Sequence, residues 1–247
     1  METKWIQDQE SLKKNLITED DYTWKLEDDD SKNNGVELLL LKYIGGVDIS
    51  FSKHDPSVAC GTLVVLEFNT LNVVYEDSVV VKIDVPYVAG FLAFREAPIF
   101  LQLLKKMQNG AHPFYPQLLM IDGNGILHPR GFGSACHLGV LANLPTIGIG
   151  KNLHHVDGLT NSRVRELLEA EENFSVDYIP LIGDSGNTLG GAILSSKGSF
   201  KPIFVSVGHR ISLDSAVKVV KRTCKYRVPE PIRQADIRSR DCLQKHH

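Results

Sequence analysis

The sequence of 247 residues is poor in cysteine, has no long apolar run and carries no large excess of charge of either sign. Its four cysteines, Cys60, Cys136, Cys224 and Cys242, are widely spaced and include no CxxC pair. This spacing argues against a disulfide framework or a zinc site and favours a reducing compartment. No stretch approaches the roughly 18–20 apolar residues that a membrane-spanning helix needs.

The composition is that of a globular protein, with 43% hydrophobic and 23% charged residues. These fractions exclude a wholly disordered chain, a collagen and a coiled coil. The net charge of −3 is unevenly distributed, because acidic residues concentrate between positions 19 and 30 and basic residues after position 218. Both clusters fit a solvated surface, and the basic one also fits contact with a polyanion.

The hydrophobic pattern predicts a mixed α/β protein. Three β-rich segments joined by short turns predict an antiparallel meander, at 42–50, 57–68 and 72–83. Helices are expected at 97–108, 133–143 and 213–224, and further strands at 118–121, 146–150, 189–194 and 202–207. Buried strands alternating with helices indicate a sheet with helices on both faces, in the order of a ribonuclease H-like fold.

The chain is expected to have one main domain with two flanking segments. Residues 1–35 are interpreted as a short helix near 5–16 followed by an acidic linker, which ends in Asn33-Asn34-Gly35. The dense apolar pattern begins at Val36, so the main domain is placed at 36–236 and a basic tail at 237–247.

Two acidic residues follow apolar strands of the predicted sheet. Asp48 ends the segment GGVD, and Asp122 ends the segment LLMID. A lone acid in this position is most often a turn or capping residue. If the two strands are neighbours, however, the carboxylates converge at one sheet edge, where they repel each other unless a cation lies between them. Such oxygen ligands suit Mg²⁺ or Mn²⁺.

Other chemically active residues accompany these acids. Glu96 opens a predicted helix, where it either favours the helix dipole or completes an Asp-Glu-Asp metal site. His128 lies in a glycine-rich loop, whose backbone N–H groups can approach a base or a phosphate. Lys151 follows an apolar strand and is well placed to face a phosphate. His209 follows another strand, and a lone histidine is more often structural than catalytic.

Six segments resemble the endonuclease V family, and its vertebrate members in particular. They are GGVDIS (45–50), VPYVAGFLAFRE (85–96), MIDGNGILHPRGFGSACHLGV (120–140), PTIGIGK (145–151), SVGHRISLDSA (206–216) and YRVPEPIRQAD (226–236). The long glycine-and-histidine motif is the most specific of the six. The resemblance implies a ribonuclease H-like fold and a Mg²⁺-dependent active site, with Mn²⁺ as a substitute.

The resemblance also assigns roles to individual positions. It implies that Asp48, Glu96 and Asp122 bind the metal and that Lys151 and His128 lie near the cleaved phosphate. It implies a base-separating wedge at Pro86-Tyr87-Val88-Ala89, where Ala89 replaces the second proline of the bacterial motif. The pocket for the flipped base is expected at Leu92, Gly123 and Gly133, and His209 is expected to contact the substrate.

The implied reaction is cleavage of nucleic acid at the second phosphodiester bond 3′ to a hypoxanthine nucleotide, leaving 3′-hydroxyl and 5′-phosphate ends. The vertebrate-like match and the softened wedge favour inosine-containing single-stranded RNA as the substrate. A cytoplasmic and nuclear, including nucleolar, location is expected. The alternatives are a repair enzyme for deoxyinosine in DNA and a non-catalytic nucleic-acid-binding module. The clustered carboxylates disfavour the binding module, because they repel an anionic ligand.

Overall fold

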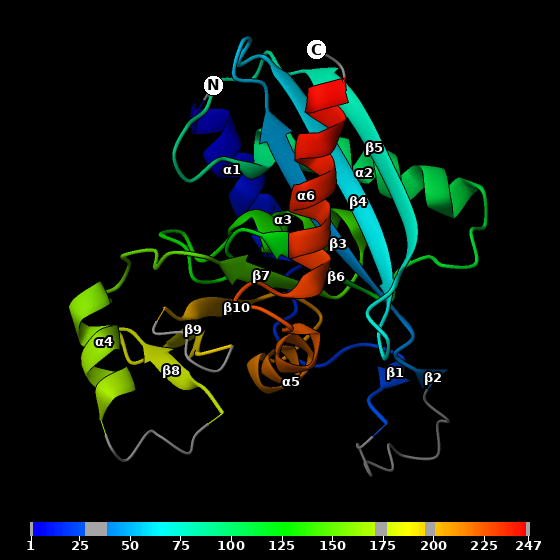
Figure 1. Cartoon of the computed structure of the whole chain (residues 1–247). Coiled ribbons are helices and arrows are strands. Elements are labelled where there is room, and N and C mark those ends of the chain that lie inside the picture. Colours follow the sequence, from blue (N-terminus) through cyan, green and yellow to red (C-terminus); the bar gives the residue numbers. More distant parts are fainter. Residues whose placement is uncertain (1, 28–38, 171–176, 196–200, 246–247) are drawn as a thin grey trace.

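A computed structural model describes residues 2–27, 39–170, 177–195 and 201–245 of the chain (Figure 1). Its main sheet has the strand order β5-β4-β3-β6-β7-β10-β9-β8. The strands are β3 (Tyr43–Phe51), β4 (Val58–Glu67), β5 (Val73–Lys82), β6 (Leu118–Asp122), β7 (Thr146–Gly150), β8 (Ile179–Ile182), β9 (Thr188–Ile193) and β10 (Ile203–His209). The central strands β3, β6 and β7 are parallel, and the other neighbouring pairs are antiparallel. A separate pair joins β1 (Trp24–Lys25) to β2 (Leu39–Leu40).

Helices cover both faces of this sheet. They are α1 (Glu2–Lys13), α2 (Ala93–Asn109), α3 (Ser134–Ala142), α4 (Asn161–Glu169), α5 (Leu213–Thr223) and α6 (Glu230–Lys245). Because successive side chains of a strand point to opposite faces, Leu118 and Met120 of β6 pack with α5 and α6, while Leu119 and Ile121 pack with α2 and α3. The predicted mixed sheet with helices on both faces is therefore confirmed.

The predicted elements of the main sheet agree with the structure to within about two residues, but α2 begins a full turn earlier than expected. A start at 97 would put Pro98 in the first turn, where proline is best tolerated. In the structure Pro98 lies inside the helix, and Leu92 already has helical backbone angles of φ −54° and ψ −36°. The ring of Phe94 stacks on Trp5 of α1, with centroids 5.1 Å apart, and this contact fixes the first turn.

Helix α6 corrects the expectation of a basic tail at 237–247, because the helix continues unbroken to Lys245. Its buried side chains include Ile232, Ala235, Ser239 and Leu243, which form a narrow stripe along one side of a mostly polar helix. Figure 1 shows α6 lying across β3 and β4, and the contacts between these elements agree. So narrow a stripe, interrupted by a serine, is a weak helix signal.

Much of the charge near the two ends of the chain is paired within the protein. Asp20 accepts hydrogen bonds from Ser212 N (2.6 Å) and Ser215 Oγ (2.7 Å), which places a carboxylate at the N-terminus of α5. In α6, arginines form ion pairs with Glu76, Glu230 and Asp236. The predicted linker lies mostly outside the described residues, and α1 occupies part of the expected helix at 5–16.

All four cysteines carry free thiols. None of the helices among the described residues combines the length and the apolar character needed to cross a bilayer.

Candidate active site

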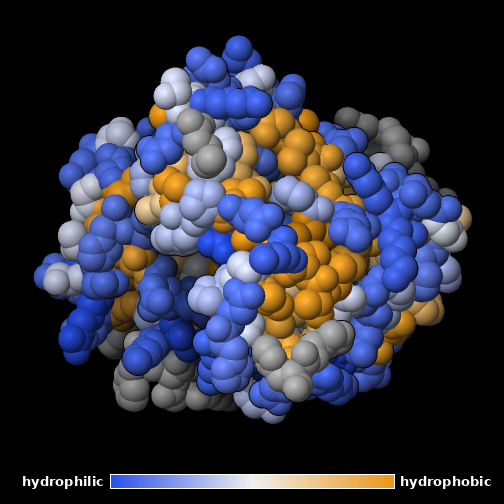
Figure 2. Space-filling model, turned by 90° about the horizontal axis from the view of Figure 1, so that it is seen from above, coloured by the Kyte–Doolittle hydropathy of each residue, from blue (hydrophilic) through white to orange (hydrophobic). Residues whose placement is uncertain are grey.

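Asp48 and Asp122 meet at one edge of the sheet. Their strands, β3 and β6, are adjacent and parallel, with Val47 opposite Ile121 in the register. Glu96 approaches from α2, and all three carboxylates line a small cavity of about 160 Å³. The carboxyl end of β3 points to the top of Figure 1, and Figure 2 shows the molecule from that side. Hydrophilic side chains there border a hollow, and an apolar area lies next to the hollow.

The three acids lie close enough to perturb one another. Asp48 and Glu96 are 8% and 7% exposed. Burial and the negative charge of Asp122 raise the pKa of Asp48 to about 7. Burial and the charges of Asp48 and Asp122 raise the pKa of Glu96 to about 8. Ionising all three groups together therefore costs free energy, which a cation between them would offset.

Lys151 is the counter-charge of this cluster. It follows β7, which is paired with β6, and its Nζ lies 2.5 Å from Asp122 Oδ2. Burial opposes the charged ammonium, but the charge and the hydrogen bond of Asp122 outweigh it, so the pKa of Lys151 is raised. Its side chain is 33% exposed. The site thus presents a fixed, partly accessible cation beside the acids.

Two residues of α6 complete the surroundings of Asp48, and neither was among the predicted site residues. Ser239 Oγ donates a hydrogen bond to Asp48 Oδ2 at 2.8 Å. The charge of Asp236 acts on both Asp48 and Lys151, raising the pKa of each. Asp236 ends the motif YRVPEPIRQAD and was within reach of sequence reasoning. Ser239 carried no signal, because its role depends on helix α6 packing against β3.

The donor set fits a divalent cation such as Mg²⁺. Three carboxylates line one cavity, and the ionised forms of two of them are disfavoured by burial and mutual repulsion. Among the described residues, no three His, Cys, Asp or Glu side chains already have the arrangement of ligands around one ion. Asp122 instead accepts a hydrogen bond from Lys151. The fit to a divalent cation therefore rests on the chemistry of the three carboxylates and not on their present arrangement.

The predicted wedge lies in an exposed loop before α2. Pro86 is exposed, and Tyr87 is 66% exposed. The ring of Tyr87 is therefore not packed in the core. Leu92 is half-buried at the start of α2, one turn before Glu96. The loop and the acid cluster are thus joined by the first turn of one helix.

The glycine-rich loop folds back on itself directly after Asp122. Gly123 has φ +156°, and Gly133 N donates a hydrogen bond to Gly125 O at 2.9 Å. A Cβ added at Gly133 would lie 2.3 Å from the carbonyl oxygen of Asn124, so this close backbone approach requires glycine. Both predicted pocket glycines therefore shape the backbone next to Asp122.

His128 lies in this loop but not in the cavity of the acids. It is 7% exposed, and its Nδ1 accepts a hydrogen bond from the backbone N–H of Arg130 at 3.3 Å. Burial and the charge of Arg130 lower the pKa of His128 to about 4, so the imidazole is neutral near pH 7. These contacts make His128 a support of the loop in this structure.

Helix α1 ties the wedge loop to the glycine-rich loop. The buried side chain of Gln9 donates hydrogen bonds to Phe132 O (2.9 Å) and Gly90 O (3.4 Å). Arg130 donates to Gln9 Oε1 at 2.5 Å and to Gly90 O at 2.6 Å. Sequence reasoning missed both Gln9 and Arg130, because their partners are distant in the chain.

His209 is not brought to this site. Strand β10 runs antiparallel to β7, and His209 pairs with Thr146 at the start of β7, whereas Lys151 follows its end. The five residue steps from Thr146 to Lys151 span about 16 Å along a strand. His209 Nδ1 instead accepts a hydrogen bond from Ile17 N at 3.2 Å, which anchors the segment after α1.

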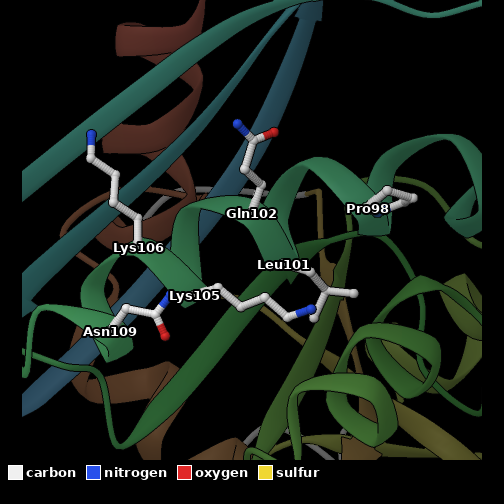
Figure 3. Close-up of a pocket in the computed structure, with 6 residues that line it drawn as sticks. All are labelled: Pro98, Leu101, Gln102, Lys105, Lys106 and Asn109. Carbon is white, nitrogen blue, oxygen red and sulfur yellow. The ribbon is translucent and has the colours of Figure 1, made fainter.

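A second hollow, of about 670 Å³, lies on the outer side of α2 and has a different character. All six of its lining side chains come from this one helix (Figure 3). Lys106 forms an ion pair with Asp77 there, and Lys105 is exposed. None of the three acids lines it. This hollow is therefore separate from the acid cluster.

Comparison with known proteins shows similarity to one family. The family model of endonuclease V matches residues 21–237. Mouse endonuclease V is 47% identical over 98% of this chain and 69% of its own length, and the human protein is 45% identical over 98% and 83%. The crystal structure of the catalytic domain of human endonuclease V has a TM-score of 0.88 at 43% identity, covering 99% of this chain and 96% of that chain.

A further solved relative is bound to nucleic acid. It is endonuclease V of Ciona intestinalis in complex with a 24mer DNA that contains an inosine followed by a ribo-adenosine. Its TM-score is 0.87 at 35% identity, with 99% of this chain and 98% of that chain covered.

The mixed sheet, the two layers of helices and these structural neighbours define a ribonuclease H-like protein, as the order of elements in the sequence predicts. The chain belongs to the endonuclease V family, which confirms the assignment made from the six motifs. It is accordingly a nuclease, within the hydrolase class.

Proposed function

We propose that this protein is a Mg²⁺-dependent endonuclease that cleaves inosine-containing RNA at the second phosphodiester bond 3′ to inosine. The observation that carries the proposal is the cavity in which Asp48, Glu96 and Asp122 meet beside Lys151. Family membership supports nucleolytic chemistry at that place. With this activity we propose a cytoplasmic and nuclear, including nucleolar, location.

Asp48, Asp122 and Glu96 are the residues that would hold Mg²⁺ or Mn²⁺. When bound, the ion would polarise the phosphate and lower the pKa of a water molecule. Water attacks phosphorus, the bond to the 3′ oxygen breaks, and that oxygen leaves as a hydroxyl after gaining a proton. The phosphate stays on the 5′ end of the downstream fragment.

The residues around the acids prepare them for this reaction. Ser239 fixes one oxygen of Asp48 through its hydrogen bond, so the carboxylate keeps its orientation. Lys151 is held at the cavity by Asp122 and stabilises negative charge that develops on the phosphate. Because the lysine is already in place, little reorganisation is needed when the substrate arrives.

We assign the recognition of inosine to the wedge loop and the glycine-rich loop, which are held together beside the acids. Hypoxanthine must leave its stack to be read, which costs less in a single strand than in a duplex. The Ciona complex contains inosine in the bound strand, which supports such recognition for this chain. Arg130 and Gln9 hold the wedge loop against the glycine-rich loop, so the region proposed as the base pocket is built before binding.

The test of the RNA preference uses three strands of one sequence, each with a single inosine. One is RNA, one is DNA, and one is DNA with a ribonucleotide beside the scissile bond. We expect efficient cleavage of the RNA and the chimera and much slower cleavage of the DNA, because the 2′-hydroxyl distinguishes RNA from DNA. Equal rates on DNA and chimera, at fixed salt and Mg²⁺, would favour the deoxyinosine repair enzyme instead.

The same assay separates an enzyme from a binding module. EDTA is expected to remove all cleavage, and added Mg²⁺ to restore it. Binding of the inosine strand without cleavage at any Mg²⁺ or Mn²⁺ concentration would contradict the enzymatic proposal.

Tyr87→Ala is expected to weaken substrate binding without unfolding the protein. The exposed ring is free to stack on a base, and such stacking contributes about 1–3 kcal/mol in single-strand binding proteins. Truncating a side chain that is 66% exposed removes little buried surface. Binding is measured by fluorescence anisotropy, with Tyr87→Phe as the control that keeps the ring. A large fall in the melting temperature with unchanged binding would show a structural role.

A further inference from the structure

A groove beside the acid cavity shares Lys151 with the site described above, and its other lining residues have no role there. It has a volume of about 790 Å³, within the roughly 300–1,000 Å³ typical of ligand sites. We call it the α4 groove. It lies between α4, the end of β7 and the start of β10, and its lining includes Lys151, Leu153, Val164, Arg165, Phe204 and Arg227. One end of it is Lys151, the lysine that contacts Asp122.

The α4 groove combines an apolar floor with cationic walls. Leu153, Val164 and Phe204 are buried in the third apolar cluster of the protein and form the floor. Four of the lining residues in the described part of the chain are cationic, and one, Glu169, is acidic. An anionic ligand with flat apolar parts is complementary to such a groove, and a nucleic-acid strand has both features.

Arg227 is a fixed component of the groove. Its Nη2 donates hydrogen bonds to Lys151 O at 2.6 Å and to Pro202 O at 2.9 Å, and its Nε donates to Lys201 O at 3.2 Å. These bonds tie the segment after β7 to the start of β10. The groove therefore keeps its shape and its charge without a ligand.

The position of the groove relates it to one side of the cleaved bond in the nucleic-acid strand. Asp48 and Asp122 stand on the neighbouring strands β3 and β6, Lys151 directly follows the next strand β7, and the groove lies on the β10 side of Lys151. The wedge loop contacts the glycine-rich loop through Gly90 and Arg130, and neither loop contributes a lining residue to the groove. Both loops are proposed to hold inosine, which lies on the 5′ side of the cleaved bond, so the groove beyond Lys151 is left for the strand on the 3′ side.

We infer that the α4 groove binds the part of the substrate strand that follows the cleaved bond, and that it holds the downstream fragment with its new 5′-phosphate. This inference rests on the proposed function, because the cut lies on the 3′ side of inosine. The lining contains no arrangement that selects one base, so binding there depends on salt and tolerates sequence.

The experiment measures KM for two inosine RNAs that share a 5′ arm. The short RNA ends about two nucleotides after the scissile bond, and the long RNA about eight nucleotides after it. Arg165→Glu reverses an exposed charge on the wall of the groove and is expected to raise KM for the long RNA about tenfold, with kcat unchanged. KM for the short RNA should change less than twofold.

Two further variants make the test specific. Glu169→Lys removes the acidic lining residue, which is the ion-pair partner of Arg165, and is expected to lower KM for the long RNA severalfold. Lys105→Glu makes the same charge change as Arg165→Glu on the outer side of α2 and is expected to leave both KM values unchanged.

The outcomes distinguish this inference from the proposed function. If the wild-type protein cleaves neither RNA, the proposed function is wrong. If it cleaves both with equal KM, and Arg165→Glu acts on both alike or on neither, the α4 groove takes another ligand and the inference is overturned. An equal effect of Lys105→Glu would also overturn it, because general charge attraction would then explain the result.

Discussion

Cleavage is expected to disappear in Asp48→Ala and Asp122→Ala, while binding of the inosine strand persists. These carboxylates line the cavity and would hold the metal, whose stabilisation of transition-state charge is several kcal/mol. Since each 1.36 kcal/mol changes a rate tenfold, the loss should be about 10³-fold or more. Cleavage is followed on gels at saturating Mg²⁺, and binding by fluorescence anisotropy.

The two variants should differ in their affinity for the substrate. Asp122→Ala releases Lys151 from its ion pair, so the free ammonium attracts phosphate and binding tightens. Asp48→Ala leaves that pair intact and should change affinity less. Asp77→Ala, which removes a carboxylate far from the cavity on β5, serves as the control. Appreciable Mg²⁺-dependent cleavage by either active-site variant would contradict the assignment.

Gly46→Ala is expected to have the largest effect on stability. A Cβ at this position of β3 would lie 2.1 Å from the carbonyl oxygen of Pro231 and 2.3 Å from its carbonyl carbon. These backbone atoms cannot move aside on their own, so α6 as a whole must shift away from the sheet. Such overpacking costs about 1–3 kcal/mol, and each kcal/mol lowers Tm by about 2–4 °C in a chain of this size.

This variant should also lose activity in its folded form. Displacing α6 withdraws Ser239 from Asp48, so the carboxylate loses the hydrogen bond that orients it. Thermal unfolding and cleavage below the transition are both measured. Gly110→Ala is the matched control, because a Cβ there has no neighbour nearer than 3.5 Å. An unchanged Tm for Gly46→Ala would show that α6 does not need this close approach.

The strands and acids of the site were within reach of the sequence, because each depends on a local pattern. The long alternating and apolar runs predict β3, β4 and β5, and Asp48 and Asp122 stand at strand ends in the sequence itself. Their meeting depends on β3 and β6 being neighbours, which strand order decides and no local pattern shows. The sequence therefore indicates the candidate acids, but it does not predict the cavity in which they meet.

The structure differs from the sequence-based expectation where tertiary packing decides. His209 follows a strand just as Lys151 does, yet it lies at the opposite edge because β10 runs antiparallel to β7. The second half of α6 was expected to be a basic tail at 237–247, because the buried stripe of this mostly polar helix is visible only against β3 and β4. Strand direction and helix docking are both long-range properties of the fold.

The hydrogen bond between Ser239 and Asp48 spans 191 residues of chain, and this separation sets the time at which the site is completed during translation. Protein synthesis proceeds at about 5–20 residues per second, so α6 is made about 10–40 s after Asp48. During that interval a nascent chain has the acid but not the helix that orients it. For a nuclease made on an RNA template, the cutting site is thus completed only after α6 has been synthesised and has packed against β3.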